Sequence, residues 1–313
     1  MRKLISGQDI RLAIYLPLFF LLAWLLPHSR WNGVAKWLAE LPQPFAPFRV
    51  RRDASTRTRR LRPIDRATQK VLRQFQYLRE LRPGGWHPEI IIENKEIALE
   101  VVAEGNGAVF WIVNTRCADL IAKKALHRIG LELHHLSRPE HGGSQSAFGK
   151  RYLNALPRLA ENQYLKERVL ITTGKELSAT RRLKEILSTG RAVSITASSE
   201  GRQTRLVRIF DGVLPLATGA PALATATDAA LIPIVCIQLP NSAPTFRVTV
   251  VPRISIDVAE TRQLANEHAF GHFAAIHQSL LSQHASQWRG FGYMLPPGQV
   301  DESTAVIEPI VPP

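Results

Sequence analysis

Val109-Phe-Trp-Ile-Val113 is an uninterrupted apolar run, and Asn114-Thr-Arg-Cys-Ala-Asp119 follows it directly. A short run of large and β-branched residues that stops at polar residues predicts a buried strand followed by the start of a helix. In open α/β sheets, ligands usually bind at the carboxyl ends of the strands. We therefore expect Asn114 and Asp119 to lie at a functional site.

Apolar runs and helical patterns alternate along the rest of the chain. Strands are predicted at 131–136, 169–173, 192–196, 231–235 and 246–251, and helices at 65–82, 119–128, 147–166 and 176–187. This alternation predicts an α/β fold, with a mixed, largely parallel sheet flanked by helices. A chain of 313 residues can hold one large domain. We expect that domain at 63–295, after an N-terminal membrane anchor and basic linker at 1–62 and before a disordered, proline-containing tail at 296–313.

The apolar run from Leu12 to Leu26 has no charged residue but contains Pro17. It is shorter than the roughly twenty apolar residues that span a bilayer, which indicates a short tilted anchor, a half-inserted helix or the apolar core of a signal peptide. A buried core helix is the alternative. Trp24 and Trp31 stand near the end of the run, as aromatic residues do at membrane interfaces.

A basic segment follows, with seven arginines between Arg49 and Arg62 and a single acid, Asp53. The net charge of the chain is +14, which favours an anionic partner. Basic residues next to an apolar segment suit anionic lipid headgroups and predict that the chain beyond them faces the cytoplasm. A solvated linker is the alternative, and no nucleic acid is expected because aromatic residues for base stacking are not interleaved. The residues expected to contact membrane lipids are Trp24, Trp31, Arg51, Arg52, Arg59 and Arg60.

The chain has two cysteines, Cys117 and Cys236, which are too few for a disulfide framework and too far apart for a C-x-x-C motif. Its ten histidines form no H-E-x-x-H pattern. We expect a reducing compartment, no metal and no cofactor.

Four stretches resemble the bacterial lipid A biosynthesis acyltransferases of the lauroyl and myristoyl type, in the lysophospholipid acyltransferase superfamily. Asn114-x4-Asp119 stands where that family has its H-x4-D/E motif. The other three are Phe210-Asp-Gly212 with Gly219 and Leu223-Ala224, which is similar to an F-x-G…G…L-A segment, Leu231-Ile-Pro233, which is similar to V-V-P, and Gln287-Trp288-Arg289, which is similar to the closing P-E-Q-W. Their order covers residues 100 to 291.

The resemblance implies a glycerolipid acyltransferase-like fold at the cytoplasmic face of a bacterial inner membrane. It implies transfer of a fatty acyl group from an acyl carrier protein or coenzyme A thioester to a hydroxyl of a lipid A-like or lysophospholipid acceptor. In the family the motif histidine takes the hydroxyl proton and the acid orients the imidazole. Asp119 keeps that acid, but the amide of Asn114 has no basic site near neutral pH.

Further substrate-binding positions follow from the resemblance. Arg168 stands where an arginine contacts substrate phosphate or carrier, and an exposed helix-end arginine is the alternative. Ser198 occupies the place of an expected aspartate. Glu200-Gly-Arg202 is similar to the E-G-T-R segment of the superfamily, and an ordinary turn is the alternative.

Three interpretations of Asn114 remain open. It caps the following helix, which makes the chain a catalytically silent relative that binds lipid or acyl carrier protein as a partner or regulatory subunit. Alternatively it orients a substrate oxygen while a histidine from elsewhere acts as base. In a third interpretation Cys117 accepts the acyl group as a nucleophile. The candidate bases are His127, His134, His135 and His141.

Overall fold

A computed structural model describes residues 4–42, 45–48, 63–172, 174–210, 212–240, 244–255, 262–282, 284, 287–290, 294–295, 300 and 305–310. The chain divides into two compact units. Unit 1 consists of Met1–Ile90, Ser137–Gln163 and Gln238–Phe246, and unit 2 of Ile91–Leu136, Tyr164–Ile237 and Arg247–Pro313. The division therefore differs from the predicted boundary between 62 and 63, because two later segments belong with the N-terminal one.

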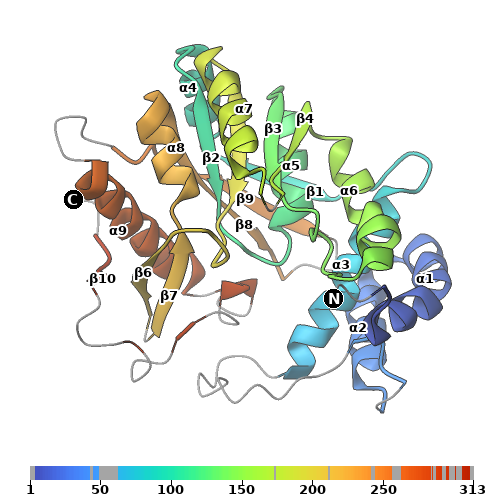
Figure 1. Cartoon of the computed structure of the whole chain (residues 1–313). Helices are drawn as coiled ribbons and strands as arrows, with labels where there is room; N and C mark the ends of the chain where they lie inside the picture. Colours follow the sequence, from blue (N-terminus) through green and yellow to red (C-terminus); the bar gives the residue numbers. More distant parts are fainter. Residues whose placement is uncertain are drawn as a thin grey trace. The chain divides into compact units, whose positions relative to one another are not determined.

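The central sheet has seven strands in the order β1-β9-β8-β2-β5-β3-β4 and is built mainly from unit 2 (Figure 1). The strands are β1 (Glu89–Glu93), β2 (Ala108–Ile112), β3 (Leu133–Ser137), β4 (Glu167–Leu170), β5 (Ala192–Thr196), β8 (Ala230–Gln238) and β9 (Thr245–Val250). β2 pairs in parallel with β5 and β8, and β3 pairs in parallel with β5. An antiparallel bridge joins Leu231 to Ile254. The predicted α/β fold with a mixed, largely parallel sheet is thus confirmed.

Helices cover the sheet of unit 2, and β2 lies at the centre of its core. The helices are α4 (Lys95–Ala103), α5 (Ala118–Arg128), α7 (Glu176–Ser188), α8 (Gly219–Thr227) and α9 (Arg262–Leu281). All five residues of β2 are buried. α8 contacts β2, and Trp111 of β2 stacks on Phe273 of α9 with ring centroids 3.6 Å apart. A strand buried on both faces explains why its sequence is continuously apolar.

A second sheet in unit 2 has the order β10-β6-β7 (Figure 1). β6 (Thr204–Ile209) and β7 (Gly212–Ala217) form an antiparallel hairpin that the sequence patterns did not predict. Phe210 in its turn has a φ of 56°, and a side chain on Gly212 would collide with Met294. Phe210 and Gly212 therefore lie at the ends of β6 and β7 where the hairpin reverses direction.

The tail prediction requires a correction for residues 305–310. β10 (Val306–Ile307) pairs in parallel with β6, so that this part of the tail is ordered. The side chain of Ile310 lies so close to Gly271 that a Cβ on that glycine would meet it at 2.6 Å. Apolar residues among the prolines supply this packing. Most of the remainder of 296–313 lies outside the described residues.

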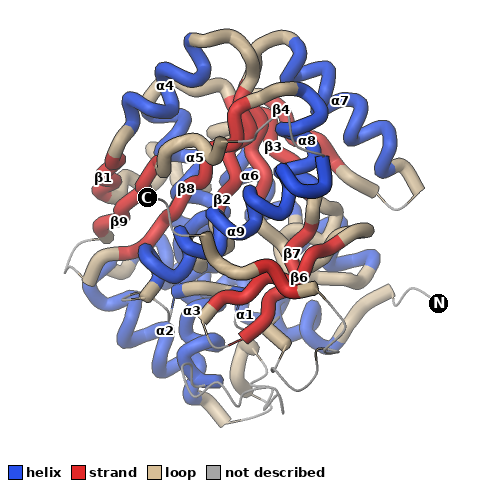
Figure 2. Tube along the Cα trace, turned by 90° about the vertical axis from the view of Figure 1, so that its left-hand side faces the viewer, coloured by secondary structure: helices blue, strands red, loops and turns tan. Residues whose placement is uncertain are grey.

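Unit 1 is built around helices, of which Figure 2 shows α1, α2 and α3 as neighbours. They are α1 (Gly7–Leu25), α2 (Trp31–Glu40) and α3 (Pro63–Glu80), with α6 (Ala155–Asn162) preceded by a π-helical turn at Gly149–Leu153. α1 begins at a capping box in which Ser6 and Asp9 satisfy each other's backbone N–H groups. The predicted apolar stripe of α3, including Val71 and Phe75, is buried against α1 and α2.

Within the described residues, α1 is the one helix long and apolar enough to cross a membrane by length and composition. Only 17% of its most apolar window is buried, so it is not a buried core helix. Its large apolar side chains that remain exposed recur at intervals of three and four, which places them on one face: Ile10, Ile14, Leu18, Leu21 and Leu25. Such a face suits a membrane anchor, and a signal sequence near the N-terminus has the same composition.

The structure corrects part of the predicted lipid-contact set. Trp31 is only 1% exposed and packs edge-on against Phe75, so its ring does not reach the surface. Trp24 is half-buried, and its indole Nε1 donates to the carbonyl of Leu78 at 2.8 Å. The four arginines of the predicted set, Arg51, Arg52, Arg59 and Arg60, lie outside the described residues.

Candidate functional site

The carboxyl end of β2 forms the candidate site in unit 2. The N–H of Val113 donates to the carbonyl of Ile234 on β8, and the N–H of Ala197 after β5 donates to that of Ile112, both at 2.8 Å. β2 and β5 therefore end together, while β8 continues to Gln238. Asn114 follows at once, and Asp119 lies in the first turn of α5. The structure places both residues where the sequence predicted them.

The stretch Gln287–Arg289 lies against the residues that follow β2. An antiparallel bridge pairs Thr115 with Trp288. On either side of the bridge, Arg116 N–H donates to the carbonyl of Gln287 at 2.9 Å and Arg289 N–H to that of Asn114 at 3.0 Å. These contacts place Gln287–Arg289, the last motif in the sequence, beside the first motif, which begins at Asn114.

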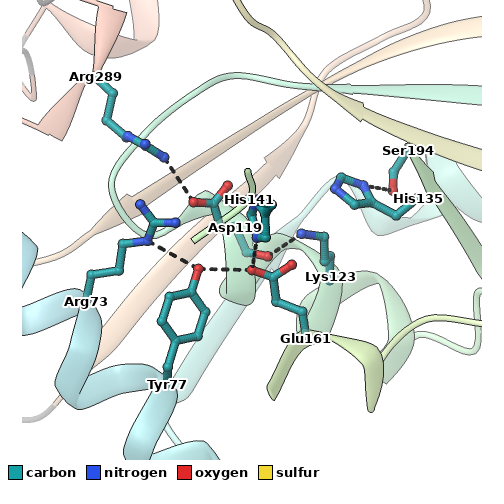
Figure 3. Close-up of polar contacts among 9 residues, drawn as sticks. All are labelled: Arg73, Tyr77, Asp119, Lys123, His135, His141, Glu161, Ser194 and Arg289. Atoms are coloured by element: carbon teal, nitrogen blue, oxygen red, sulfur yellow. Dashed lines mark hydrogen bonds and ion pairs between the residues drawn. The ribbon is translucent and has the colours of Figure 1, made fainter. Parts of the chain in front are cut away.

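Asp119 forms an ion pair with Arg289, shown in Figure 3. The guanidinium Nη1 donates to the carboxylate Oδ2 at 2.9 Å. The carboxylate side chain is 6% exposed, whereas that of Arg289 is 34% exposed. A charge-assisted bond to a nearly buried carboxylate holds both side chains in one geometry. Sequence reasoning named Arg289 only as part of a motif and did not predict this pairing.

Trp288 anchors this arrangement in the core. It is 1% exposed and makes edge-on ring contacts with Phe210, at 6.0 Å, and His277, at 5.6 Å. Burial lowers the pKa of His277 to about 4, so the imidazole stays neutral near pH 7. The β6–β7 turn and the closing motif therefore share one apolar cluster. With Pro233 opposite Trp111 in the sheet register, all four stretches gather around β2.

Asn114 does not cap α5. The N-cap position is Cys117, and no side chain caps it there, so the capping interpretation is wrong. The side-chain oxygen Oδ1 of Asn114 is buried and has no hydrogen-bond partner in the described part of the chain. A buried acceptor without a partner costs about 1–3 kcal/mol, which a donor from a bound molecule can offset.

Lys123 is a buried cation that the sequence patterns did not identify. Its side chain is fully buried, and its Nζ donates to the backbone carbonyl of Asp119 at 2.7 Å (Figure 3). The next residue, Lys124, is also buried and places its Nζ over the ring of Tyr164 at 5.0 Å. Adjacent lysines on a helix usually face solvent, so no local signal distinguished this pair.

Three of the four candidate histidine bases belong to unit 2. His127 is exposed beside Tyr164. His134 and His135 are buried in β3, where their Nδ1 atoms lie 3.2 Å from the carbonyl of Ala192 and 2.9 Å from the hydroxyl of Ser194. The two adjacent side chains thus bond to groups of β5.

The fourth, His141, belongs to a buried network in unit 1 (Figure 3). Its Nε2 lies 2.6 Å from Glu161 Oε1, and the Tyr77 hydroxyl donates to the same oxygen at 2.9 Å. Arg73 Nε in turn donates to the Tyr77 hydroxyl at 3.2 Å. The Glu161 side chain is 0% exposed and that of His141 is 16% exposed. An imidazole held by a buried carboxylate has the orientation that general bases need.

The remaining predicted substrate-binding residues take three different places in unit 2. Ser198 follows β5, and its Oγ accepts a hydrogen bond from Glu200 N–H at 3.0 Å, which closes a local turn. Glu200 and Arg202 are exposed in the β5–β6 connection. Arg168 lies in β4, with β3 and β5 between that strand and β2. Only Ser198 therefore shares the strand-end edge with Asn114.

Cys117 does not have the features of a reactive nucleophile. Its Sγ lies 3.3 Å from that of Cys236, and both residues are buried. Burial and the neighbouring thiol raise the pKa of Cys236 well above its usual value. A thiolate is the reactive form of cysteine, and such surroundings oppose it.

In the portion of the chain that is described, no group of three or more His, Cys, Asp or Glu side chains is arranged to hold a metal ion. The sequence matches none of the models of known protein families, and a comparison with curated proteins gives no match either.

Proposed function

We propose that this chain is a membrane-associated acyltransferase homologue with a glycerolipid acyltransferase-like domain. It transfers a fatty acyl group from an acyl carrier protein or coenzyme A thioester to a hydroxyl of a lipid A-like or lysophospholipid acceptor. The observation that supports this most is the gathering of four motif-bearing stretches around the carboxyl end of β2, where Asn114 and Asp119 lie. Stretches far apart in the sequence have no local reason to converge on one strand end.

In this proposal the acceptor hydroxyl donates a hydrogen bond to the buried Oδ1 of Asn114, which otherwise lacks a partner among the described residues. The hydroxyl oxygen attacks the thioester carbonyl, so a C–O bond forms and the C–S bond breaks. Asp119 holds Arg289, whose other N–H groups face the growing negative charge on the carbonyl oxygen. The hydroxyl proton passes to a base and then to the leaving thiolate.

The carboxylate of Asp119 is the first target for a test. Purified protein in detergent is incubated with radiolabelled acyl donor and lipid extract, and acylated lipid is measured. Asp119→Asn should lower kcat/KM at least tenfold, because the orientation of Arg289 is lost. Asp228→Asn is the matched control, since Asp228 is exposed and asparagine tolerates its left-handed φ of 54°. Activity indifferent to Asp119, with intact folding by thermal unfolding, would refute the proposal.

Neither Asn114 nor the paired Asp119 is a suitable proton acceptor, so the base is a separate residue. Replacing His127, His134, His135 and His141 by glutamine one at a time identifies it, because loss of a general base costs roughly 10²–10⁴-fold. A folded variant with that loss, and with a pH–rate profile that no longer shows the fall in rate at acidic pH caused by protonation of the base, is the expected result. Equal activity in all four variants would show that none of these four histidines is the base.

A second candidate is a catalytically silent relative that binds lipid or acyl carrier protein as a partner or regulatory subunit. It is favoured by one observation: the acid of the motif pairs with an arginine, which stays charged. Asn114→His separates the two candidates. If it creates acyl transfer that the native chain lacks, the native chain is the silent relative, whereas activity of the native chain refutes that alternative.

We also propose that the chain associates with a membrane. The exposed apolar face of α1 supports an anchor at a cytoplasmic membrane surface. Replacing Ile14 and Leu21, which are 69% and 58% exposed, by serine should move the protein from liposomes to the soluble fraction in a flotation assay. Leu177→Ser is the matched control, because Leu177 is 80% exposed and belongs to α7 of unit 2. Flotation that is unchanged in the double variant would contradict anchoring through this face.

A further inference from the structure

Unit 1 contains a cavity of about 560 Å³ that the candidate site does not use. Six side chains dominate its lining: His28, Trp31, Arg79, Arg82, Trp86 and His87. The turn that follows α3, at 83–85, closes one side of it. A volume in this range is typical of small-molecule sites in proteins.

The cavity is electropositive. None of its ten lining residues is acidic, and across the described residues neither Arg79 nor Arg82 forms an ion pair with a carboxylate. Burial and the charge of Arg82 lower the pKa of Arg79. Binding of an anion reduces the repulsion between two like charges in one partly buried space. Guanidinium groups also match the geometry of phosphate.

Both arginines also reach the end of α1. Arg79 Nη1 donates to the carbonyls of Ala23 and Trp24 at 2.9 and 2.7 Å, and Arg82 Nη1 lies 3.4 Å from the carbonyl of Trp24. The next residue, Leu25, is 76% exposed. The cavity therefore lies at the C-terminal end of the helix whose apolar face suits a membrane. An anion there is at the depth of lipid headgroups when α1 contacts a bilayer.

The aromatic residues argue against a nucleotide. Trp31 and Trp86 are 1% and 5% exposed. Their rings already contact one another at 5.9 Å, and each also contacts His28. Base recognition by stacking needs an open ring face, which neither offers. The indole Nε1 of Trp31 is buried without an acceptor among the described residues, which leaves one donor that a ligand oxygen can satisfy.

From the cavity, its two arginines and its position at the end of α1, we propose that it binds the phosphate ester of an anionic lipid headgroup. A soluble phosphate ester has the same chemistry and is separated from the lipid by the test. This inference goes beyond the proposed acyl transfer and does not require it, because it concerns equilibrium binding to unit 1.

The test is isothermal titration calorimetry of the detergent-solubilised full chain with short-chain dihexanoyl phosphatidylglycerol, glycerol 3-phosphate and adenosine monophosphate. Arg82→Gln is the main variant, because Arg82 is exposed and its side chain makes one long hydrogen bond among the described residues, to the carbonyl of Trp24. Arg151→Gln is the matched control, an exposed arginine of unit 1 outside the cavity lining. Arg79→Lys provides a second variant that keeps charge but loses the planar fork.

The lipid should bind more tightly than glycerol 3-phosphate, and Arg82→Gln should weaken it roughly tenfold while Arg151→Gln leaves it unchanged. Equal affinity for the lipid and glycerol 3-phosphate would mean that the cavity binds the phosphate of a soluble ester. That result overturns the proposal that the ligand is a lipid headgroup. Tighter binding of adenosine monophosphate overturns the headgroup proposal. Equal affinities of the two glutamine variants, with both folded, place the binding outside the cavity and overturn it as well.

His28 supplies a readout that is independent of affinity. Burial and the charge of Arg79 lower its pKa to about 4. The charged groups near it are Arg79 and Arg82 in the lining, with His87 beside them and Glu80 behind Gly85. A bound phosphate should raise the pKa of His28, measured by the NMR shifts of its ring during a pH titration. An unchanged titration at saturating lipid contradicts binding in this cavity.

Discussion

Asp119 in unit 2 and Glu161 in unit 1 are both nearly inaccessible carboxylates, but their partners differ. Asp119 pairs with Arg289 at 2.9 Å, and arginine keeps its charge at every physiological pH. Glu161 holds the imidazole of His141 and the hydroxyl of Tyr77. Imidazole is the side chain that exchanges a proton near neutral pH.

The difference shows that the position of a carboxylate in a motif does not by itself indicate the chemistry that its partners allow. The acid in the motif position is paired with a permanent cation, which suits it to orientation and charge stabilisation. The acid outside any motif holds an imidazole and a phenol hydroxyl. Variants of the two carboxylates and of their partners can show whether they differ in energy as they do in chemistry.

The largest expected effect is the loss of Glu161. Glu161→Ala leaves the Tyr77 hydroxyl and His141 Nε2 without their buried acceptor, so the free energy of unfolding should fall by about 3–4 kcal/mol. Urea denaturation followed by fluorescence measures it. Glu161→Gln keeps an acceptor oxygen and should cost about 1 kcal/mol. Similar losses for the two variants would mean that the loss of the carboxylate charge, and not the missing acceptor, sets the cost.

The second largest expected effect is a loss of stability at acidic pH, caused by a histidine near Asp119. His277 contacts Trp288, next to Arg289, and its pKa is lowered to about 4. The unfolded chain takes up this proton near its ordinary value of about 6.5 while the folded chain does not. Stability is therefore complete above about pH 6.5 and falls by about 3 kcal/mol as the pH approaches 4.

His277→Asn removes this titration and keeps a donor for the Phe273 carbonyl, which His277 Nδ1 approaches at 2.8 Å. The difference in unfolding free energy between the native chain and the variant should shrink as the pH falls from 7 to 4. Chemical denaturation at several pH values measures it. Parallel pH profiles for the two proteins would show that His277 is not held neutral.

The smallest effect expected is the coupling between Asp119 and Arg289. A double-mutant cycle with Asp119→Asn and Arg289→Gln should give a coupling energy of about 1–2 kcal/mol, because one partner is nearly buried. The control cycle uses Glu167 and Arg182, whose side chains are 34% and 46% exposed. It should give a smaller coupling energy that declines with salt. Equal coupling energies in the two cycles would mean that burial of Asp119 does not strengthen its ion pair.

Local patterns were sufficient for the elements that carry the site. The apolar run before Asn114 is the buried strand β2, and the helix predicted after it begins at Ala118. The stripe of α3 is buried as its periodicity predicted. Continuous or periodic apolar residues produce such elements because burial of that surface drives folding and the period decides the element.

Pairings across the chain could not be predicted in this way. Arg289 reaches Asp119 across 170 positions, and Tyr77 reaches Glu161 across 84. Trp31 has the composition of an interfacial residue yet lies in the core of unit 1. The type of a residue shows only which groups its side chain can bond to. Many side chains in the chain could be the partner of any one of them.

The sequence by itself thus determined the α/β class, the strand end with Asn114 and Asp119, and an apolar helix at the N-terminus. Only the tertiary structure decided that Asp119 holds an arginine, that Glu161 holds a histidine and that two arginines meet at the end of α1. The physical reason is that periodicity acts between neighbours in the chain, whereas burial and charge pairing depend on which distant segments the packed core brings together.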